Sequence, residues 1–230
     1  MGMKGLSIII AAYNEAENIR ETAESVLREI PPAITDFELI LVDDGSSDGT
    51  GEIIESLSSS NSLIHAVQHP LNLGKGAALI SGFKRCGKDW IIFLDADGQI
   101  AFSELAAFLP FTESFDMIIG YRINRRLSFL RRLLSWGYKR LTACFLDISV
   151  KDVGCPFKLF RKSILESMAL KSRGFIIDAE LLYKTISRGF RIKELPVSSQ
   201  RRRRGASKVG FYDAFDTLKE FIKLLVKLHR

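Results

Sequence analysis

The sequence is poor in cysteine and histidine and has no long apolar run. Its three cysteines are scattered and lack CxxC spacing, which favours reduced thiols and a cytoplasmic location over a disulfide framework or a zinc site. Its three histidines form no cluster, so no histidine-based catalytic set is indicated. No uncharged apolar stretch approaches about eighteen residues, so no bilayer-spanning helix is predicted. The first residues also lack the composition of a secretory leader.

The net charge of +6 is unevenly distributed along the chain. Residues 121–146 contain seven Lys and Arg and no acid, and residues 201–230 contain nine Lys and Arg against three acids. The rest of the chain carries 17 basic and 24 acidic residues. The two late segments therefore hold the whole positive excess and are the candidates for contact with an anionic partner.

The first two-thirds of the chain alternates apolar runs with helical patterns. Strands are predicted at 6–11, 37–42, 64–67, 90–94 and 117–119. Helices are predicted at 17–30, from about 50, at 76–86 and from about 103. Strands buried on both faces read as continuous apolar runs, so the pattern predicts an α/β fold with a mostly parallel sheet between helices. Ligands of such sheets bind beyond the carboxyl ends of the strands.

Acidic residues stand at two of these predicted strand ends. Asp43 and Asp44 follow the second strand, and Asp95 and Asp97 follow the fourth. In an extended chain, residues two apart point to the same side, so Asp95 and Asp97 can address one cation. Hard carboxylate oxygens suit Mg²⁺ or Mn²⁺, which bind through one or two carboxylates together with substrate phosphates.

The sequence GKGAAL, residues 74–79, has the glycine spacing of a dinucleotide-binding turn. Such a turn requires a strand directly before its first glycine, whereas HPLNL precedes it here, so a nicotinamide or flavin enzyme is not indicated. We assign Lys75 to capping of this loop in preference to contact with a nucleotide. His69, which precedes a proline, is interpreted as a loop residue and not as a general base.

Two segments combine apolar and basic residues at helical spacing, 127–146 and 211–229. Basic amphipathic helices can lie in a membrane interface, although packing against the domain with a solvated basic face explains each one as well. We expect one domain over residues 1–210, which includes the first of these helices, followed by a C-terminal amphipathic helix over 211–230.

Ordered motifs in the chain resemble those of a known family. SIIIAAYNEAENI (7–19), LILVDDGSSDGT (39–50), NLGKGAAL (72–79) and IIFLDADGQ (91–99) resemble the nucleotide-sugar half of family-2 glycosyltransferases, which have the Rossmann-like GT-A fold. IIGYR (118–122), DVGCPFKLFRK (152–162), GFIIDAELLYK (174–184) and ELPVSSQRRRRGASKV (194–209) are similar to the polyprenyl-phosphate members, of the dolichol-phosphate mannosyltransferase and dolichyl-phosphate glucosyltransferase types. The resemblance covers nearly the whole chain.

The resemblance implies three overlapping groups of site residues. The nucleotide sugar would contact Ala11, Tyr13, Glu15, Asp43, Asp44 and Asp95. The metal, Mg²⁺ or Mn²⁺, and the catalytic step would involve Asp95, Asp97 and Gln99. The acceptor phosphate would contact Arg122, Arg131, Ser135 and Arg202, followed by the loop 205–208. Asp178 matches a position close to the donor sugar, although an acid that stabilises a helix dipole explains it equally.

The resemblance implies inverting transfer of a hexose to a polyprenyl or dolichyl phosphate at the cytoplasmic face of a membrane. Such an acceptor is already nucleophilic, because a phosphate monoester with a second pKa of about 6 is largely dianionic at pH 7. It requires a cationic pocket and no general base. The donor stays open between GDP-mannose and UDP-glucose, because Cys155 and Pro156 depart from the mannosyltransferase pattern.

Three other interpretations remain. A family-2 enzyme with a soluble or polysaccharide acceptor would keep the donor site and use the arginines for solubility. A nucleic-acid-binding module is suggested by the four arginines at 201–204, but the run lacks stacking aromatics and the strand ends are acidic, so no nucleic-acid partner is predicted. A catalytically silent scaffold would not need the donor-site acids.

Overall fold

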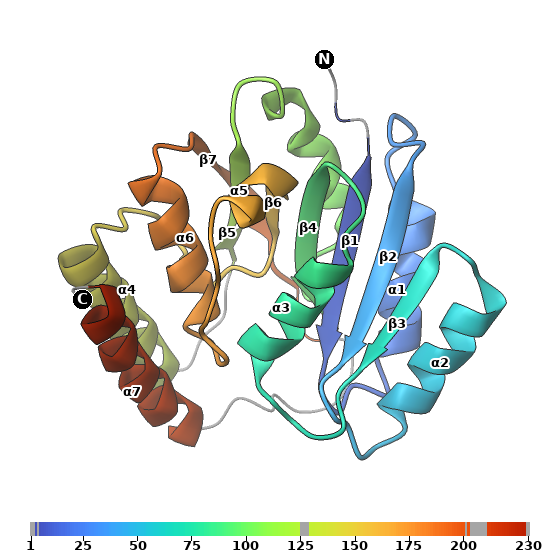
Figure 1. Cartoon of the computed structure of the whole chain (residues 1–230), viewed down its shortest axis with the longest axis horizontal. Helices are drawn as coiled ribbons and strands as arrows, with labels where there is room; N and C mark the ends of the chain where they lie inside the picture. The colour runs from blue at the N-terminus through green and yellow to red at the C-terminus, as the bar shows by residue number, and fades with distance from the viewer. Residues whose placement is uncertain (1–2, 4, 125–128, 201, 203–210, 229–230) are drawn as a thin grey trace.

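A seven-stranded sheet with helices on both faces forms the centre of the protein (Figure 1). The computed structural model describes residues 3, 5–124, 129–200, 202 and 211–228. The strands, given in chain order, are β1 (Leu6–Ala12), β2 (Phe37–Asp43), β3 (Ile64–Gln68), β4 (Trp90–Asp95), β5 (Met117–Ile123), β6 (Lys158–Arg161) and β7 (Ile192–Ser198). The five predicted strands are confirmed, whereas β6 and β7 were not predicted.

The order of the strands brings most carboxyl ends to one edge of the sheet. The order is β3-β2-β1-β4-β6-β5-β7, and β1 to β4 are mutually parallel. Only β6 runs the other way, antiparallel to both β4 and β5, and β7 is parallel to β5. Strands β5 and β7 therefore end at the same edge as β1, β2 and β4. In the register of the sheet, Ala12 lies opposite Asp43 and Ala11 opposite Asp95.

Helices cover the two faces of the sheet unequally. The helices are α1 (Ile19–Glu29), α2 (Thr50–Ser60), α3 (Lys75–Arg85), α4 (Phe129–Leu146), α5 (Lys162–Glu166), α6 (Ile177–Ser187) and α7 (Phe211–Leu228), with 3₁₀ turns η1 (Phe102–Ala107) and η2 (Leu109–Phe111). Buried side chains of α1, α2 and η1 pack on one face, and those of α3, α5, α6 and α7 pack on the other. The mostly parallel α/β sheet expected from the sequence is confirmed.

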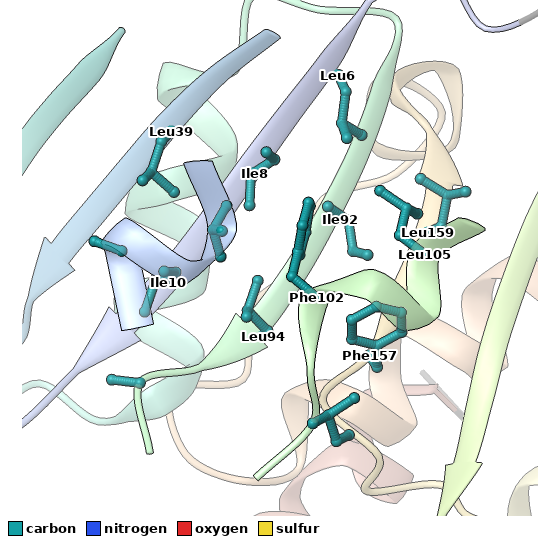
Figure 2. Packing of buried hydrophobic residues seen from close by; sticks show 14 of the residues in the cluster. Leu6, Ile8, Ile10, Leu39, Ile92, Leu94, Phe102, Leu105, Phe157 and Leu159 are labelled. Atoms are coloured by element: carbon teal, nitrogen blue, oxygen red, sulfur yellow. The ribbon is translucent and has the colours of Figure 1, made fainter. Parts of the chain in front are cut away.

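The core on the first face is continuous from β2 across to β6 (Figure 2). Ile8 and Ile92, from neighbouring strands, are fully buried there beside Phe102 of η1. Phe157 stacks edge-on against Phe102 and Phe108, and Phe160 is fully buried in the core on the other face. Phe157 and Phe160 are therefore core residues.

The helix expected from about residue 103 is wrong, because two 3₁₀ turns occupy this segment. Phe102, Leu105 and Phe108 are spaced three residues apart, and each is at most 2% exposed. Three residues per turn, the repeat of a 3₁₀ helix, places all three on the sheet side. Pro110 follows and lacks the N–H that a continuing α-helix would use.

Both amphipathic segments form helices, α4 and α7, which lie side by side beyond α6 (Figure 1). Residues 127, 128 and 229 of the expected segments fall outside the described part of the chain, as does the boundary expected after residue 210. Phe221 and Leu224 anchor α7 in the same core as α3 and α6. Within the described ranges, no helix is long and apolar enough to cross a bilayer.

Candidate functional site

A cleft of about 470 Å³ opens at the edge of the sheet where β1, β2 and β4 end. This volume lies within the range of small-molecule sites. Residues expected from the sequence to bind donor, metal or acceptor make up a large part of its lining: Ala11, Tyr13, Glu15, Asp44, Asp95, Asp97 and Arg202. Residues of α3, α7 and the segment before α6 also line it: Lys75, Ala78, Gly174, Phe175, Asp216, Thr217 and Glu220.

Asp95 and Asp97 lie together at the end of β4. The side chain of Asp95 is 40% exposed, and that of Asp97 only 17%. Burial, together with the neighbouring charge of Asp95, raises the pKa of Asp97 to about 6. Gln99 donates its backbone N–H to Asp97 Oδ1 at 3.2 Å, and Gln99 is not among the cleft-lining residues.

The two carboxylates fit a divalent cation. The repulsion between two neighbouring carboxylates is relieved by a shared cation, and carboxylate oxygens are the ligands that Mg²⁺ and Mn²⁺ prefer. Among the residues that the structure describes, no three Asp, Glu, His or Cys side chains converge into a metal cage. Asp95 and Asp97 would therefore leave the remaining coordination positions to phosphate oxygens and water, as is usual for Mg²⁺.

Lys75, the first residue of α3, reaches into this acidic group. Its Nζ lies 3.2 Å from Asp95 Oδ1 and 3.5 Å from Asp178 Oδ2. Burial opposes the charged form, but Asp178 and Asp95 outweigh it and raise the pKa of Lys75. The expectation that Lys75 only caps its loop is wrong. The signal that could have located it is the loop itself, which precedes α3 at the carboxyl edge of the sheet.

A fully buried ion pair, Lys158 with Asp178, is in contact with Lys75. Lys158 of β6 donates to Asp178 Oδ1 at 2.5 Å and also to the Cys155 carbonyl. Burial raises the pKa of Asp178, but Lys158 and Lys75 outweigh it, so the pKa of Asp178 lies below its ordinary value. Asp178 thus links two lysines, and it does more than stabilise the start of α6. Nothing local in the sequence distinguishes Lys158 from a surface lysine on a strand.

Asp44 organises the turn that precedes α3. Its carboxylate accepts hydrogen bonds from the backbone N–H of Leu73 at 3.0 Å and of Gly74 at 2.8 Å. His69 lies in the loop between β3 and α3, as expected, and its Nδ1 lies 2.7 Å from Asp44 Oδ1. Asp43 is also buried and accepts from the Ser46 N–H at 3.1 Å, but it does not line the cleft.

Arg202 spans the cleft from the segment that follows β7. Its guanidinium donates to both carboxylate oxygens of Glu15, and its Nη1 lies 3.7 Å from Asp97 Oδ2. Glu15 is in turn held by its own N–H, which donates to Thr50 Oγ1 at 2.8 Å. The structure therefore brings a residue expected to bind the acceptor against residues expected to bind donor and metal. The neighbouring loop 205–208 lies outside the described residues.

Arg122, near the end of β5, is held by Asp152. Its Nε and Nη2 donate to the two oxygens of that carboxylate at 2.7 and 2.9 Å. Burial opposes its charge, but Asp152 outweighs this effect and raises the pKa of Arg122. Ser135 lies half-buried on α4 and, like Arg122, is not among the cleft-lining residues. Arg131 also belongs to α4, but its side chain lies outside the described part of the structure.

A mostly parallel sheet with a cleft at its carboxyl edge is characteristic of doubly wound α/β proteins, which bind their ligands at this edge. The sequence profile described as glycosyl transferase family 2 matches residues 7–168. The chain belongs to this family and is a glycosyltransferase.

Two curated relatives cover most of the chain. Polyprenol monophosphomannose synthase of Mycolicibacterium smegmatis is 28% identical over an alignment of 216 residues that covers 88% of this chain and 80% of the relative. Undecaprenyl-phosphate mannosyltransferase of Micrococcus luteus is 27% identical over an alignment of 215 residues that covers 88% of this chain and 86% of the relative. The resemblance to polyprenyl-phosphate glycosyltransferases is thereby confirmed.

A solved structure has the same fold. Glucosyl-3-phosphoglycerate synthase from Mycobacterium tuberculosis, crystallised with Mn²⁺, uridine diphosphate and phosphoglyceric acid, matches with a TM-score of 0.75 at 17% identity. The match covers 96% of this chain and 78% of that one. It confirms the GT-A fold expected from the sequence.

Proposed function

We propose that this glycosyltransferase transfers a hexose from a nucleotide diphosphate sugar to a polyprenyl phosphate at a membrane surface. One observation carries the proposal: β4, β5 and β7 end at the same edge, so that Asp95, Asp97 and Arg202 line one cleft and Arg122 of β5 lies at the same edge of the sheet. Carboxylates suit a cation on a diphosphate, and arginines suit a phosphate monoester. The names of the two curated relatives support a polyprenyl phosphate acceptor and the transfer of mannose.

The donor would lie over β1, β2 and β4, where Ala11, Tyr13, Glu15 and Asp44 line the cleft. Asp95 and Asp97 would hold Mg²⁺ or Mn²⁺, which, when bound, neutralises the charge that develops on the departing nucleoside diphosphate. Lys75 positions Asp95 and adds a fixed positive charge beside it. The turn held by Asp44 shapes the wall next to Lys75. GDP-mannose and UDP-glucose are the two candidate donors.

The acceptor phosphate would bind to Arg202 and Arg122, with Arg131 and Ser135 of α4 as further ligands. Guanidinium binds phosphate with the same two-pronged geometry that Arg122 now uses on Asp152. The phosphate is itself the nucleophile, so a single displacement with inversion needs no protein base. His69, whose ring nitrogens lie within hydrogen-bonding distance of Asp44 and Ser81, is not among the residues that line the cleft.

The membrane surface would be contacted by α4 and α7. Both helices carry large exposed apolar side chains, among them Trp136 and Phe145 on α4 and Ile222 on α7. Exposed basic residues lie on the same helices, including Arg140 and Lys223. This combination suits peripheral binding to the anionic cytoplasmic leaflet.

The test is transfer of radiolabelled sugar into an organic extract. The protein is incubated with Mn²⁺ or Mg²⁺, with labelled GDP-mannose or UDP-glucose, and with or without undecaprenyl or dolichyl phosphate. We expect label in the organic phase only when one of these donors, a divalent cation and the lipid phosphate are all present.

Label that appears in a water-soluble product without lipid phosphate would overturn the proposal in favour of a soluble or polysaccharide acceptor. Label transfer that is unaffected by EDTA would contradict the metal assignment alone.

A further inference from the structure

Helix α7 forms part of the wall of the donor cleft. Asp216, Thr217 and Glu220, from one side of this helix, line the cleft together with Asp95 and Asp97. Phe221 and Leu224, on the adjacent side, are buried in the core. A segment that the sequence indicates only as a basic amphipathic helix therefore contributes directly to the site.

The opposite side of α7 is an apolar stripe in contact with water. Leu218, Ile222 and Val226 are 42%, 54% and 50% exposed. Their spacing of four residues places them in one row along the helix. Lys219 and Lys223, both exposed, run in the next row. An apolar row flanked by lysines is the pattern of a helix that lies in the interface of an anionic bilayer.

Helix α4 continues this surface. Leu133 and Trp136, three residues apart, form its apolar row and are 51% and 58% exposed, whereas Phe145, 56% exposed, lies on the opposite side of α4 from Trp136. The ring of Phe145 contacts that of Phe221 of α7, with centroids 6.2 Å apart, and the two helices lie side by side (Figure 1). Exposed basic residues on α4 are Arg132, Lys139 and Arg140. One flat lipid surface can cover the apolar rows of both helices when α7 is seated against α4 as observed.

A short strap, residues 171–175, connects α7 to the donor site. Both carboxylate oxygens of Glu220 accept from the Gly174 N–H at 3.1 Å. The approach is so close that a Cβ on Gly174 would lie 2.5 Å from Glu220 Oε2. On its other side the strap is in contact with α3: Arg173 O accepts from the Ala77 N–H at 3.0 Å.

The contact between the strap and α3 continues to the catalytic acids. A Cβ on Gly76 would lie 2.3 Å from the Ser172 carbonyl oxygen, so only glycine permits this packing. The residue before Gly76 is Lys75, which holds Asp95 at 3.2 Å. A continuous set of close contacts thus runs from Glu220 through the strap and the start of α3 to the carboxylate pair.

We propose that α7 couples a lipid surface to the donor site: docking of the apolar rows of α4 and α7 on an anionic bilayer holds α7 in its seat and thereby tightens nucleotide binding. This proposal rests on the proposed function, because it assumes that the cleft binds the nucleotide. The bilayer favours the seated helix because only that arrangement buries both apolar rows at once. Coupling of this kind is reciprocal, so nucleotide must tighten vesicle binding by the same factor.

The experiment measures nucleotide affinity with and without vesicles, in the absence of lipid acceptor. Mn²⁺ with GDP and Mn²⁺ with UDP are titrated calorimetrically into the full chain, alone or with vesicles of phosphatidylglycerol and phosphatidylcholine. For the nucleotide that binds, we expect vesicles to lower its Kd about fivefold. The affinity of the protein for vesicles, measured by flotation, should increase by the same factor when nucleotide is saturating.

Three variants separate the steps. Ile222→Asp should keep the nucleotide Kd measured without vesicles and lose the response to vesicles. Glu220→Ala should still float with vesicles and lose the response, because its link to Gly174 is gone. Leu63→Asp, an exposed leucine outside α4 and α7, is the matched control and should behave as the unaltered protein.

The outcomes distinguish the coupling from the function on which it rests. Vesicle binding with an unchanged nucleotide Kd overturns the coupling and leaves the proposed function intact. A response of Glu220→Ala equal to that of the unaltered protein also overturns it. Absence of any nucleotide binding contradicts the proposed function and the coupling together.

Discussion

In the half of the sheet formed by β1 to β4, backbone N–H groups hold the carboxylates of Asp44 and Asp97. In the half formed by β5 to β7, carboxylates hold Arg122 and Arg202 instead. Asp44 accepts from Leu73 and Gly74, and Asp97 accepts from the N–H of Gln99. Arg122 and Arg202 instead bind carboxylates, those of Asp152 and Glu15.

This difference separates a preformed side from an exchangeable side. A backbone N–H has a position that is set by the fold, so a carboxylate that accepts from it is held in place. An arginine bound to a carboxylate can exchange that partner for a phosphate, because both anions accept the same pair of N–H groups. We therefore interpret the donor side as ready for its ligand and the acceptor side as waiting in internal ion pairs.

The largest effect should come from the carboxylate pair on the preformed side. Asp95→Asn and Asp97→Asn should each lower turnover about a thousandfold, since loss of the cation removes several kcal/mol of transition-state stabilisation. Turnover at saturating substrates and Mn²⁺ binding by electron paramagnetic resonance are the measurements. Asp36→Asn is the control, because Asp36 is exposed and lies at the opposite edge of the sheet. Full turnover in either site variant would contradict a catalytic role for that carboxylate.

The preformed side is also the part that the sequence predicts well. Strands β1, β2 and β4 are largely apolar, and β2 and β4 end in Asp43 and Asp95, so both the strands and these acids have local signals. A parallel sheet then places those ends at one edge without any further information. The position of Asp95 beside Ala11 follows directly from this register.

The rest of the site depends on contacts distant in the sequence. Strand β6 inserts antiparallel between β4 and β5, and no local pattern indicates this insertion. It buries Lys158 against Asp178, and that pair in turn supports Lys75. The pairing of Arg202 with Glu15 joins residues 187 positions apart. Such partners can be identified only once the fold has brought them together.

The next largest effect should be on stability, at the buried ion pair of Lys158 and Asp178. Asp178 also contacts Lys75 and so joins the two halves. Asp178→Asn should lower the free energy of unfolding by about 3 kcal/mol at neutral pH, because it leaves Lys158 charged and buried without its carboxylate. Urea unfolding measures the change. A loss no larger than that of Asp36→Asn, which alters an exposed pair, would contradict this role.

The same pair predicts a dependence on pH. The pKa of Asp178 in the folded protein lies below its ordinary value of 3.8, so its ionisation stabilises the fold above that pH. This stabilisation is lost as the pH falls through 3.8 towards the lower folded value. The stability difference between the unaltered protein and Asp178→Asn should therefore be constant near neutrality and narrow in acid. A difference that widens in acid would reverse the assigned sign.

A smaller stability effect compares one glycine from each region. Gly76→Ala should destabilise by about 2 kcal/mol, because its Cβ would meet the Ser172 carbonyl oxygen, which is backbone and cannot move aside. Gly137→Ala in α4, whose Cβ would meet no described atom within 4 Å, should stabilise by about 0.8 kcal/mol through helix propensity. Thermal unfolding of both variants measures the contrast, and equal shifts would refute it.

The smallest effect should come from the exchangeable side. Arg122→Lys keeps the charge but loses the two-pronged geometry, so the KM for lipid phosphate should rise about tenfold while the nucleotide Kd is unchanged. Arg161→Lys is the matched control. Arg161 also pairs with an aspartate, Asp116, but it lies opposite Trp90, at the edge of the sheet where β4 begins. A change in nucleotide Kd without a change in KM would assign Arg122 to the donor side.

The central claim is that a cation on Asp95 and Asp97 and an acceptor phosphate on the arginines occupy one cleft. Its most direct test is the ³¹P linewidth of a short-chain isoprenyl monophosphate added to the protein with Mn²⁺ and nucleoside diphosphate. We predict strong paramagnetic broadening with the unaltered protein, and its reduction in the Asp95→Asn, Asp97→Asn double variant to the level of Mn²⁺ without protein. Broadening that is identical in the two proteins would contradict the account.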